Sequence, residues 1–211
     1  VNSKTDLTFA NGLRSILRQD PNIIFVGEIR DAETAGIAIN AALTGHLVVS
    51  TLHTNDAATS LPRLTDMHVE PFLVASSVSL IVAQRLVRKI CEYCRISTTI
   101  TEAELQKSLP ASVISKHYIP TGENKEIRIY KGQGCKNCRF TGYSGRVGIF
   151  EVLEVSKEIR QLITQRQDSD VIMQQAIKEG MTPMLDDGLM KVSKGITTIE
   201  EILRVTKVES I

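Results

Sequence analysis

The sequence predicts an α/β protein built from three segments, and three observations support this prediction. In residues 1–90, two short apolar runs alternate with helical patterns, which is the order that a parallel sheet with crossover helices needs. Two Cys-x-x-Cys pairs lie within residues 91–140, and residues 141–211 read as a strand followed by short helical periods. We therefore predict part of a parallel sheet, a four-cysteine module and a C-terminal bundle of short helices.

The first segment reads as helix, strand, helix and strand. Phe9, Leu13, Ile16 and Leu17 recur at helical spacing and predict an amphipathic helix that ends before Asp20-Pro21. The continuous apolar run 23–26 is typical of a parallel strand that is buried on both faces. Asp31 can cap a helix over 32–43, and a second strand is predicted over 47–52.

The middle of the chain is less regular. Pro71 suits the first turn of a buried helix predicted over 72–81. Residues 84–90 fit either a continuation of that helix or a strand, and the sequence leaves both open. The polar stretch 98–131 is predicted to protrude between the cysteine pairs, with a strand around Ile127.

The last segment is predicted to hold a strand over 146–155 and then four short helices. Ser, Thr and Asp favour helix starts because their side-chain oxygens accept a bond from a first-turn N–H group. Thr198 and Glu201 also stand at the spacing of a capping box. The predicted helix starts are Ser156, Asp168 or Ser169, Thr182-Pro183, and Thr198.

Composition narrows the class of protein. The chain has 42% apolar residues, and 25 Lys and Arg against 24 Asp and Glu give a net charge of +1. A nucleic-acid motor is therefore the weakest hypothesis, because no overall basic footprint is present. The longest apolar stretch, 71–83, contains three serines and is too short to cross a bilayer, and no signal peptide is evident.

The four cysteines form two pairs with the same spacing, Cys91 with Cys94 and Cys135 with Cys138. Paired two-residue spacings present thiolates convergently to a tetrahedral ion, so we predict a structural zinc site with no open position for catalysis. This chemistry favours a reducing cytoplasm. Two redox pairs or buried free thiols remain the alternative.

Polar side chains follow both predicted strands at their carboxyl ends, where ligands bind in open α/β sheets. Glu28 follows the first strand, and His53 and Thr54 follow the second. A carboxylate in this position can meet a metal-bound phosphate or orient a water, although pairing with Arg30 on the surface is the alternative. His46 precedes the second strand, and a structural role is at least as well supported there.

These blocks carry a resemblance to a known family. Residues 27–31 and 45–56 resemble the Walker B and histidine boxes of the secretion ATPases that drive type II secretion and type IV pilus assembly. Residues 82–86 and the cysteine pairs resemble the assembly-type members, since retraction ATPases of the superfamily lack the four cysteines. The resemblance implies a RecA-like core that uses ATP with Mg²⁺, together with Zn²⁺. By the same resemblance, Glu28 and His53 are catalytic, and Arg30 and Thr54 belong to the nucleotide or magnesium shell.

The resemblance also implies partners and a location. The family acts as a hexameric ring that works with an inner-membrane platform protein and a cytoplasmic adaptor, and its members are cytoplasmic and peripheral to the inner membrane through those partners. No role for nucleic acid is expected. The 211 residues contain no Gly-x-x-x-x-Gly-Lys-Ser/Thr phosphate loop, so we expect the C-terminal portion of a longer ATPase that does not hydrolyse ATP alone. A non-catalytic, zinc-stabilised protein-interaction module is the alternative.

Overall fold

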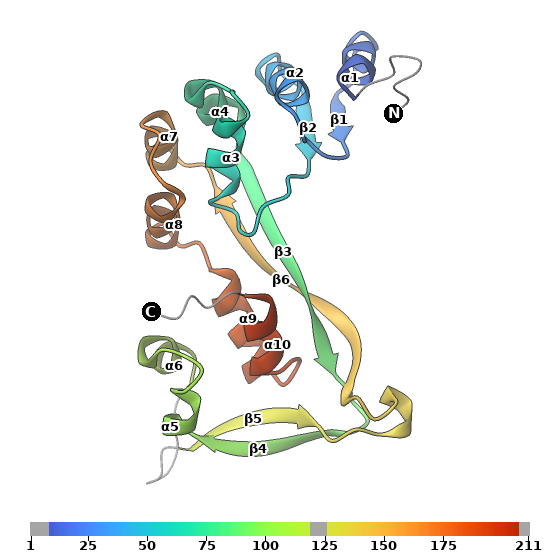
Figure 1. The fold of residues 1–211 in the computed structure, drawn as a ribbon, viewed down its shortest axis with the longest axis vertical. Helices are drawn as coiled ribbons and strands as arrows, with labels where there is room; N and C mark the ends of the chain where they lie inside the picture. Colours follow the sequence, from blue (N-terminus) through green and yellow to red (C-terminus); the bar gives the residue numbers. More distant parts are fainter. Residues whose placement is uncertain (1–8, 119–125, 207–211) are drawn as a thin grey trace. The chain divides into compact units, whose positions relative to one another are not determined.

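The structure is a computed structural model that describes residues 9–118 and 126–206, and their elements form two compact units (Figure 1). Unit 1 comprises Val1–Val82 and Val152–Met181, and unit 2 comprises Ala83–Glu151 and Thr182–Ile211. The chain therefore leaves unit 1 and later returns to it. The three-domain division at 1–90, 91–140 and 141–211 stays a prediction.

Unit 1 contains the predicted helix, strand, helix and strand. Helix α1 (Phe9–Leu17) precedes strand β1 (Ile23–Val26), and helix α2 (Ala32–Leu43) leads to strand β2 (Leu47–Ser50). The strands pair in parallel with Ile23 opposite Leu47, which confirms the crossover topology. Strand β2 ends two residues earlier than predicted.

The start of α2 follows the local rule that predicted it. Asp31 has an extended backbone, and its Oδ1 accepts a 2.7 Å bond from the Thr34 N–H group. At the other end, Gly45 adopts φ +102°, a left-handed value that glycine reaches without strain, and the helix does not continue. Only Gly45 and His46 then separate the helix cap at Thr44 from the first residue of β2, Leu47.

The prediction that β1 is buried on both faces was wrong for the described residues. Ile24 and Val26 are buried, whereas the side chains on the other face, Ile23 and Phe25, are 64% and 70% exposed. Helix α2 packs against both α1 and β2 and so covers one face of the pair. Both faces of β1 are apolar, and the described part of unit 1 covers only one of them.

Unit 1 also holds helices α3 (Ser60–Asp66), α4 (Pro71–Ser77), α7 (Lys157–Thr164) and α8 (Ser169–Lys178). Helix α4 packs against α7, and α7 against α8. Pro71 lies in the first turn of α4, as predicted, but the helix stops at Ser77 instead of continuing to residue 81. The reason is that Leu80 and Ile81 already belong to the next strand.

Two long strands from the middle of the chain form a two-stranded sheet. Strand β3 (Leu80–Ile90) pairs with strand β6 (Tyr143–Glu154). Residues 84–90 are therefore a strand, which decides between the two alternatives. Strand β6 contains almost all of the predicted strand 146–155 and begins three residues earlier.

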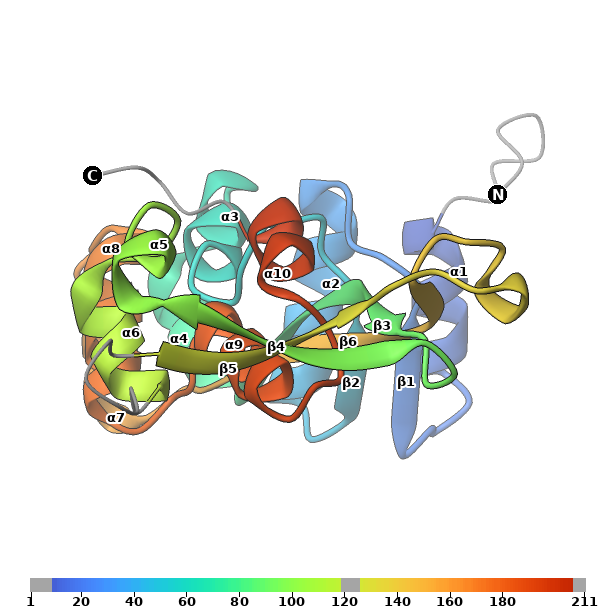
Figure 2. The same cartoon turned by 90° about the horizontal axis from the view of Figure 1, so that it is seen from below.

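In unit 2, strand β4 (Arg95–Thr101) pairs with strand β5 (Glu126–Gly132) in antiparallel register. Helices α5 (Glu102–Leu105) and α6 (Ala111–His117) lie at one end of this pair, and the cysteine loops lie at the other (Figure 2). The strand at Ile127 was predicted, whereas β4 was not. Two further helices complete the unit, α9 (Met184–Ser193) and α10 (Ile199–Val205).

The core of unit 2 is formed by side chains of its strands and of its helices. A cluster of buried side chains from β3, β5, β6 and the helices excludes water from the interior. Among the described helices, none has the length and hydropathy that a bilayer crossing requires. The members of the cluster are Val87, Leu105, Leu109, Ile114, Tyr118, Ile127, Ile149, Met184, Leu189, Val192, Ile199 and Ile202.

Candidate functional site

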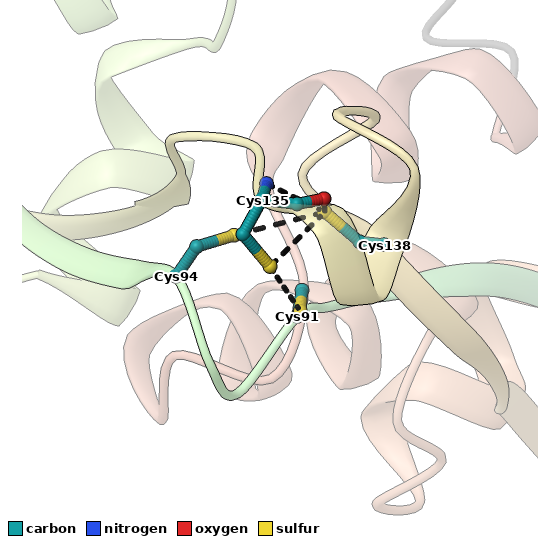
Figure 3. A group of neighbouring side chains, drawn as sticks. All are labelled: Cys91, Cys94, Cys135 and Cys138. Atoms are coloured by element: carbon teal, nitrogen blue, oxygen red, sulfur yellow. Dashed lines mark hydrogen bonds between the residues drawn. The ribbon is translucent and has the colours of Figure 1, made fainter.

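The four predicted cysteine ligands come together in unit 2. Cys91 and Cys94 lie in the loop between β3 and β4. Cys135 directly precedes the 3₁₀ turn Lys136–Cys138, and Cys138 is the last residue of that turn (Figure 3). The four Sγ atoms all lie within 4.8 Å of one another. Two segments separated by β4, α5, α6 and β5 are thus brought to one point, because the β4–β5 pairing closes the intervening loop.

The sulfur positions fit a tetrahedral metal site. A tetrahedral ion with Zn–S bonds of about 2.3 Å requires ligand sulfurs about 3.8 Å apart. The Sγ atoms of Cys91 and Cys135 are 3.9 Å apart, and those of Cys94 and Cys138 are 3.8 Å apart. Within the second pair, the Sγ atoms of Cys135 and Cys138 are 3.7 Å apart, close to the separations across the two pairs. Similar separations within and across the pairs fit one convergent four-thiolate site better than two separate redox pairs.

Backbone N–H groups point at the sulfurs and favour their charged form. Gly134 N lies 3.3 Å from Cys94 Sγ, while Cys138 Sγ receives N–H bonds from Cys135 at 3.1 Å and Gly142 at 3.3 Å. The bond from the Cys135 N–H group lowers the pKa of the Cys138 thiol to about 6, whereas burial raises the pKa of Cys94 to about 11.

The loop that carries Cys135 and Cys138 closes on itself through glycines at its two ends. A Cβ atom placed on Gly132 would lie 2.1 Å from the Gly142 carbonyl oxygen, so no other residue fits there without moving the backbone. The sequence analysis did not single out Gly134 or Gly142. Their signal was the glycine that directly precedes Cys135 and the one that follows Cys138 by four residues.

The second candidate site lies in unit 1, where the loops after β1 and β2 meet. The Glu28 carboxylate Oε2 accepts bonds from Arg30 Nε at 2.5 Å and from His53 Nε2 at 2.9 Å. Glu28 is 23% exposed, whereas the side chains of Arg30 and His53 are 67% and 79% exposed. The Arg30 and His53 bonds hold the pKa of the Glu28 carboxyl below its usual range.

Backbone and hydroxyl bonds hold these two loops together. Ile29 N donates to Thr51 O at 3.0 Å, and Thr51 Oγ1 donates to Gly27 O at 2.6 Å. These bonds extend the parallel pairing beyond the strands and bring the residues after each strand side by side. The role of Thr51 was not predicted. The only signal for it in the sequence is a polar residue directly after an apolar strand, and this signal is weak.

Thr54, the other predicted nucleotide ligand, bonds elsewhere. Its Oγ1 lies 2.8 Å from Ser60 Oγ at the start of α3. Asp56 accepts from Thr59 N at 2.8 Å and orders the same turn. The structure therefore brings Glu28, Arg30 and His53 into one cluster and places Thr54 in the adjoining turn.

His46 has the structural role that the sequence supported. Its Nδ1–H donates to the Ala41 carbonyl oxygen at 3.0 Å, and its backbone N–H bonds the same oxygen at 3.2 Å. Both bonds satisfy a carbonyl at the end of α2. His46 is therefore separate from the Glu28 cluster, since it stands at the amino end of β2.

Comparison with known proteins shows where the chain belongs. The family model described as "Type II/IV secretion system protein" matches residues 1–204. The chain is 47% identical over 206 residues to the type IV pilus assembly ATPase PilB of Thermus thermophilus, covering 98% of this chain and 22% of that protein. It is 44% identical over 207 residues to the type II secretion system ATPase E of Vibrio cholerae, covering 98% and 39%.

Solved structures agree with the fold. The pilus retraction motor PilT with bound ADP superposes with a TM-score of 0.63 at 25% identity, covering 96% of this chain and 45% of that chain. The Legionella pneumophila ATPase DotB gives a TM-score of 0.61 at 24% identity, over 94% and 42%. The chain spans between 22% and 39% of the length of the curated relatives described above. By its family match and these relatives, the chain belongs to the type II/IV secretion system protein family.

Proposed function

We propose that this chain supplies the Walker B and histidine chemistry of an ATPase that couples ATP hydrolysis to pilin or pseudopilin assembly. The observation that carries the proposal is the 2.9 Å contact between Glu28 Oε2 and His53 Nε2 at the carboxyl ends of β1 and β2. Ligands of open α/β sheets bind at this edge. The relatives named above are assembly and secretion ATPases, which supports the same assignment.

In this proposal Glu28 acts on the attacking water or through the magnesium shell of the bound ATP. Its lowered pKa keeps the carboxylate ionised at neutral pH, so it can accept a proton or a hydrogen bond from water. His53 holds the carboxylate in place and, being largely exposed, can contact the terminal phosphate. Arg30 and Thr54 are proposed as members of the nucleotide or magnesium shell.

The 211 residues hold no phosphate loop, so hydrolysis in this proposal depends on a loop supplied from outside them. The chain alone is not expected to turn over ATP. We further propose a homo-hexamer that works in the cytoplasm with an inner-membrane platform protein and a cytoplasmic adaptor, and without nucleic acid. Contact with the inner membrane would run through these partners.

Zinc is proposed at Cys91, Cys94, Cys135 and Cys138, where four thiolates complete the coordination of the ion and leave no place for substrate. A closed site of this kind stabilises the fold and performs no chemistry. This site is also what favours the second candidate function. A zinc-stabilised module that binds protein partners and hydrolyses nothing would need the cysteines but not Glu28.

The substitution Glu28→Gln separates the two functions. It keeps the size of the side chain and removes the charge, so a protein that contains the phosphate loop should lose turnover and keep nucleotide affinity. Glu33→Gln is the control, because Glu33 is an exposed acid in the first turn of α2 that pairs with Arg14. A wild-type turnover that is no higher than the background level of Glu28→Gln would favour the interaction module.

A further inference from the structure

Unit 2 has a pocket that neither candidate site uses. Its volume is about 490 Å³, and its lining consists of Leu86, Arg88, Arg146 and Arg204. Strand β3 contributes Leu86 and Arg88, strand β6 contributes Arg146, and helix α10 contributes Arg204. Three arginines from three elements therefore line one hollow.

Two of these arginines are fixed by one buried acid. Glu201, whose side chain is 2% exposed, accepts from Arg88 Nη2 at 2.6 Å and from Arg204 Nε and Nη2, both at 3.0 Å. The backbone N–H of Arg88 fills a further acceptor position at 3.0 Å. The carboxylate is thus fully bonded, and it holds both guanidinium groups while about half of each arginine side chain stays exposed.

The pocket keeps an excess of positive charge. The Arg88 guanidinium holds the pKa of Glu201 at about 2, so this acid is ionised at neutral pH and offsets one of the three arginine charges. The Arg88 guanidinium also lies 4.2 Å from the centre of the Tyr143 ring, which restricts its orientation further. Two arginines are thus held in place before any ligand arrives.

Arg146 has no structural task that would explain its position. Its side chain is exposed and forms no hydrogen bond or ion pair with another residue in 9–118 and 126–206. It also lines a neighbouring hollow of about 380 Å³ together with Lys89 and Arg95. Glu201 is already satisfied by Arg88 and Arg204, so the internal ion pairs do not account for the third arginine.

We propose that this pocket binds a phosphate-class anion. Arg146, which has no side-chain partner among the described residues, is the arginine whose pairing the ligand would supply. Guanidinium groups present planar pairs of N–H donors that match phosphate oxygens, and two of the three here are already oriented. The exposed apolar side chain of Leu86 borders the same hollow. The phosphate can belong to a soluble ligand or to the headgroup of an anionic lipid, and the test separates these two sources.

The test uses the 211-residue chain loaded with zinc. Pyrophosphate is titrated by calorimetry into wild type, Arg146→Gln, Arg146→Lys and Arg128→Gln. Arg128 is the matched control, since it is an exposed arginine of unit 2 on β5 that lies outside the pocket lining. Zinc content and circular dichroism of each variant show that it is folded. In parallel, the same four proteins are tested for co-sedimentation with vesicles of phosphatidylglycerol and with vesicles of phosphatidylcholine.

The proposal expects saturable binding that Arg146→Gln weakens about tenfold or more, that Arg146→Lys weakens less, and that Arg128→Gln leaves unchanged. If this pattern appears with pyrophosphate, the site accepts a soluble phosphate. If it appears only with phosphatidylglycerol vesicles, the ligand is a lipid headgroup. Absence of binding in both arms, or binding that Arg146→Gln and Arg128→Gln affect equally, overturns the proposal.

Discussion

His53 Nε2 lies 2.9 Å from Glu28 Oε2, and this bond joins the loop after β1 to the loop after β2. The two residues are 25 positions apart in the sequence, and the parallel pairing of the strands brings them together. A residue that positions a catalytic carboxylate affects turnover more than it affects nucleotide binding.

The substitution His53→Ala should therefore lower the kcat for ATP by at least about tenfold in a protein that contains the phosphate loop, with little change in nucleotide affinity. The reason is that Glu28 loses one of its two partners and turns away from the water that it orients. His46→Ala is the control, because His46 bonds the end of α2 and lies outside the cluster. Steady-state kinetics of both variants checks this prediction, and equal kcat values for wild type and His53→Ala would contradict it.

Metal analysis of the chain purified without chelators should find about one zinc per chain. The substitution Cys138→Ser should remove the metal and lower the melting temperature, because Cys138 Sγ accepts bonds from two backbone N–H groups and is one of the four proposed zinc ligands. Tyr93→Ser is the control, since Tyr93 lies between Cys91 and Cys94 in the other cysteine loop, is 80% exposed and offers no ligand to the site. Less than about half an equivalent of zinc in wild type would count against a stable four-thiolate site.

Glu201→Gln should lower the free energy of unfolding by about 2 to 3 kcal/mol, since it leaves Arg88 and Arg204 without their shared buried carboxylate. Glu200→Gln, at the neighbouring exposed position, should change it by less than about 0.5 kcal/mol. Urea denaturation of the three zinc-loaded proteins measures both values. A loss of the same size in both variants would show that the ion pair does not stabilise unit 2.

The contribution of Glu201 should also depend on pH. Its pKa is about 2 in the folded protein against an ordinary 4.5, so protonation costs more in the folded protein than in the unfolded chain. The stability difference between wild type and Glu201→Gln should be complete above pH 4.5 and should shrink as the pH falls towards 2. Urea denaturation of both proteins over this pH range measures the difference. The zinc concentration is the same for both, so that any loss of metal at low pH affects wild type and variant alike. A difference that stays constant between pH 6 and pH 3 would contradict the assigned pKa.

The parts of the structure that the sequence predicted well depend on local rules. Asp31 and Ser156 cap α2 and α7 through bonds to residues three positions ahead, and such contacts are visible in the sequence. Thr198 likewise accepts from Glu201 N at 3.4 Å. The second half of that predicted capping box is absent, because the Glu201 side chain bonds Arg88, which is 113 positions away.

The parts that the sequence predicted poorly depend on distant partners. Strand β4 carries Ser97, Thr98 and Thr99, so its apolar alternation is weak, and it forms because β5 pairs with it. The end of α4 was missed because no glycine or proline separates the helix from β3, and apolar residues resume directly after its last serines.

The same distinction applies to the candidate sites. The equal spacing of the two cysteine pairs was enough to predict that four sulfurs converge, and they do. The proximity of His53 to Glu28 follows from the rule that carboxyl ends of parallel strands meet, whereas the pairing with Arg30 is the alternative that the sequence left open. The bond from Thr54 to Ser60 did not follow from any such rule, because it depends on how the turn before α3 closes.

The central claim is that Glu28 faces a bound nucleotide. The most direct test is a crystal structure of a longer form that contains the phosphate loop, with magnesium and a non-hydrolysable ATP analogue. The proposal predicts the Glu28 carboxylate within hydrogen-bond distance of a water or magnesium ligand beside the terminal phosphate, with His53 next to it. A Glu28 that stays paired with Arg30 on a surface away from the nucleotide would contradict the claim and would leave the zinc-stabilised interaction module as the better account.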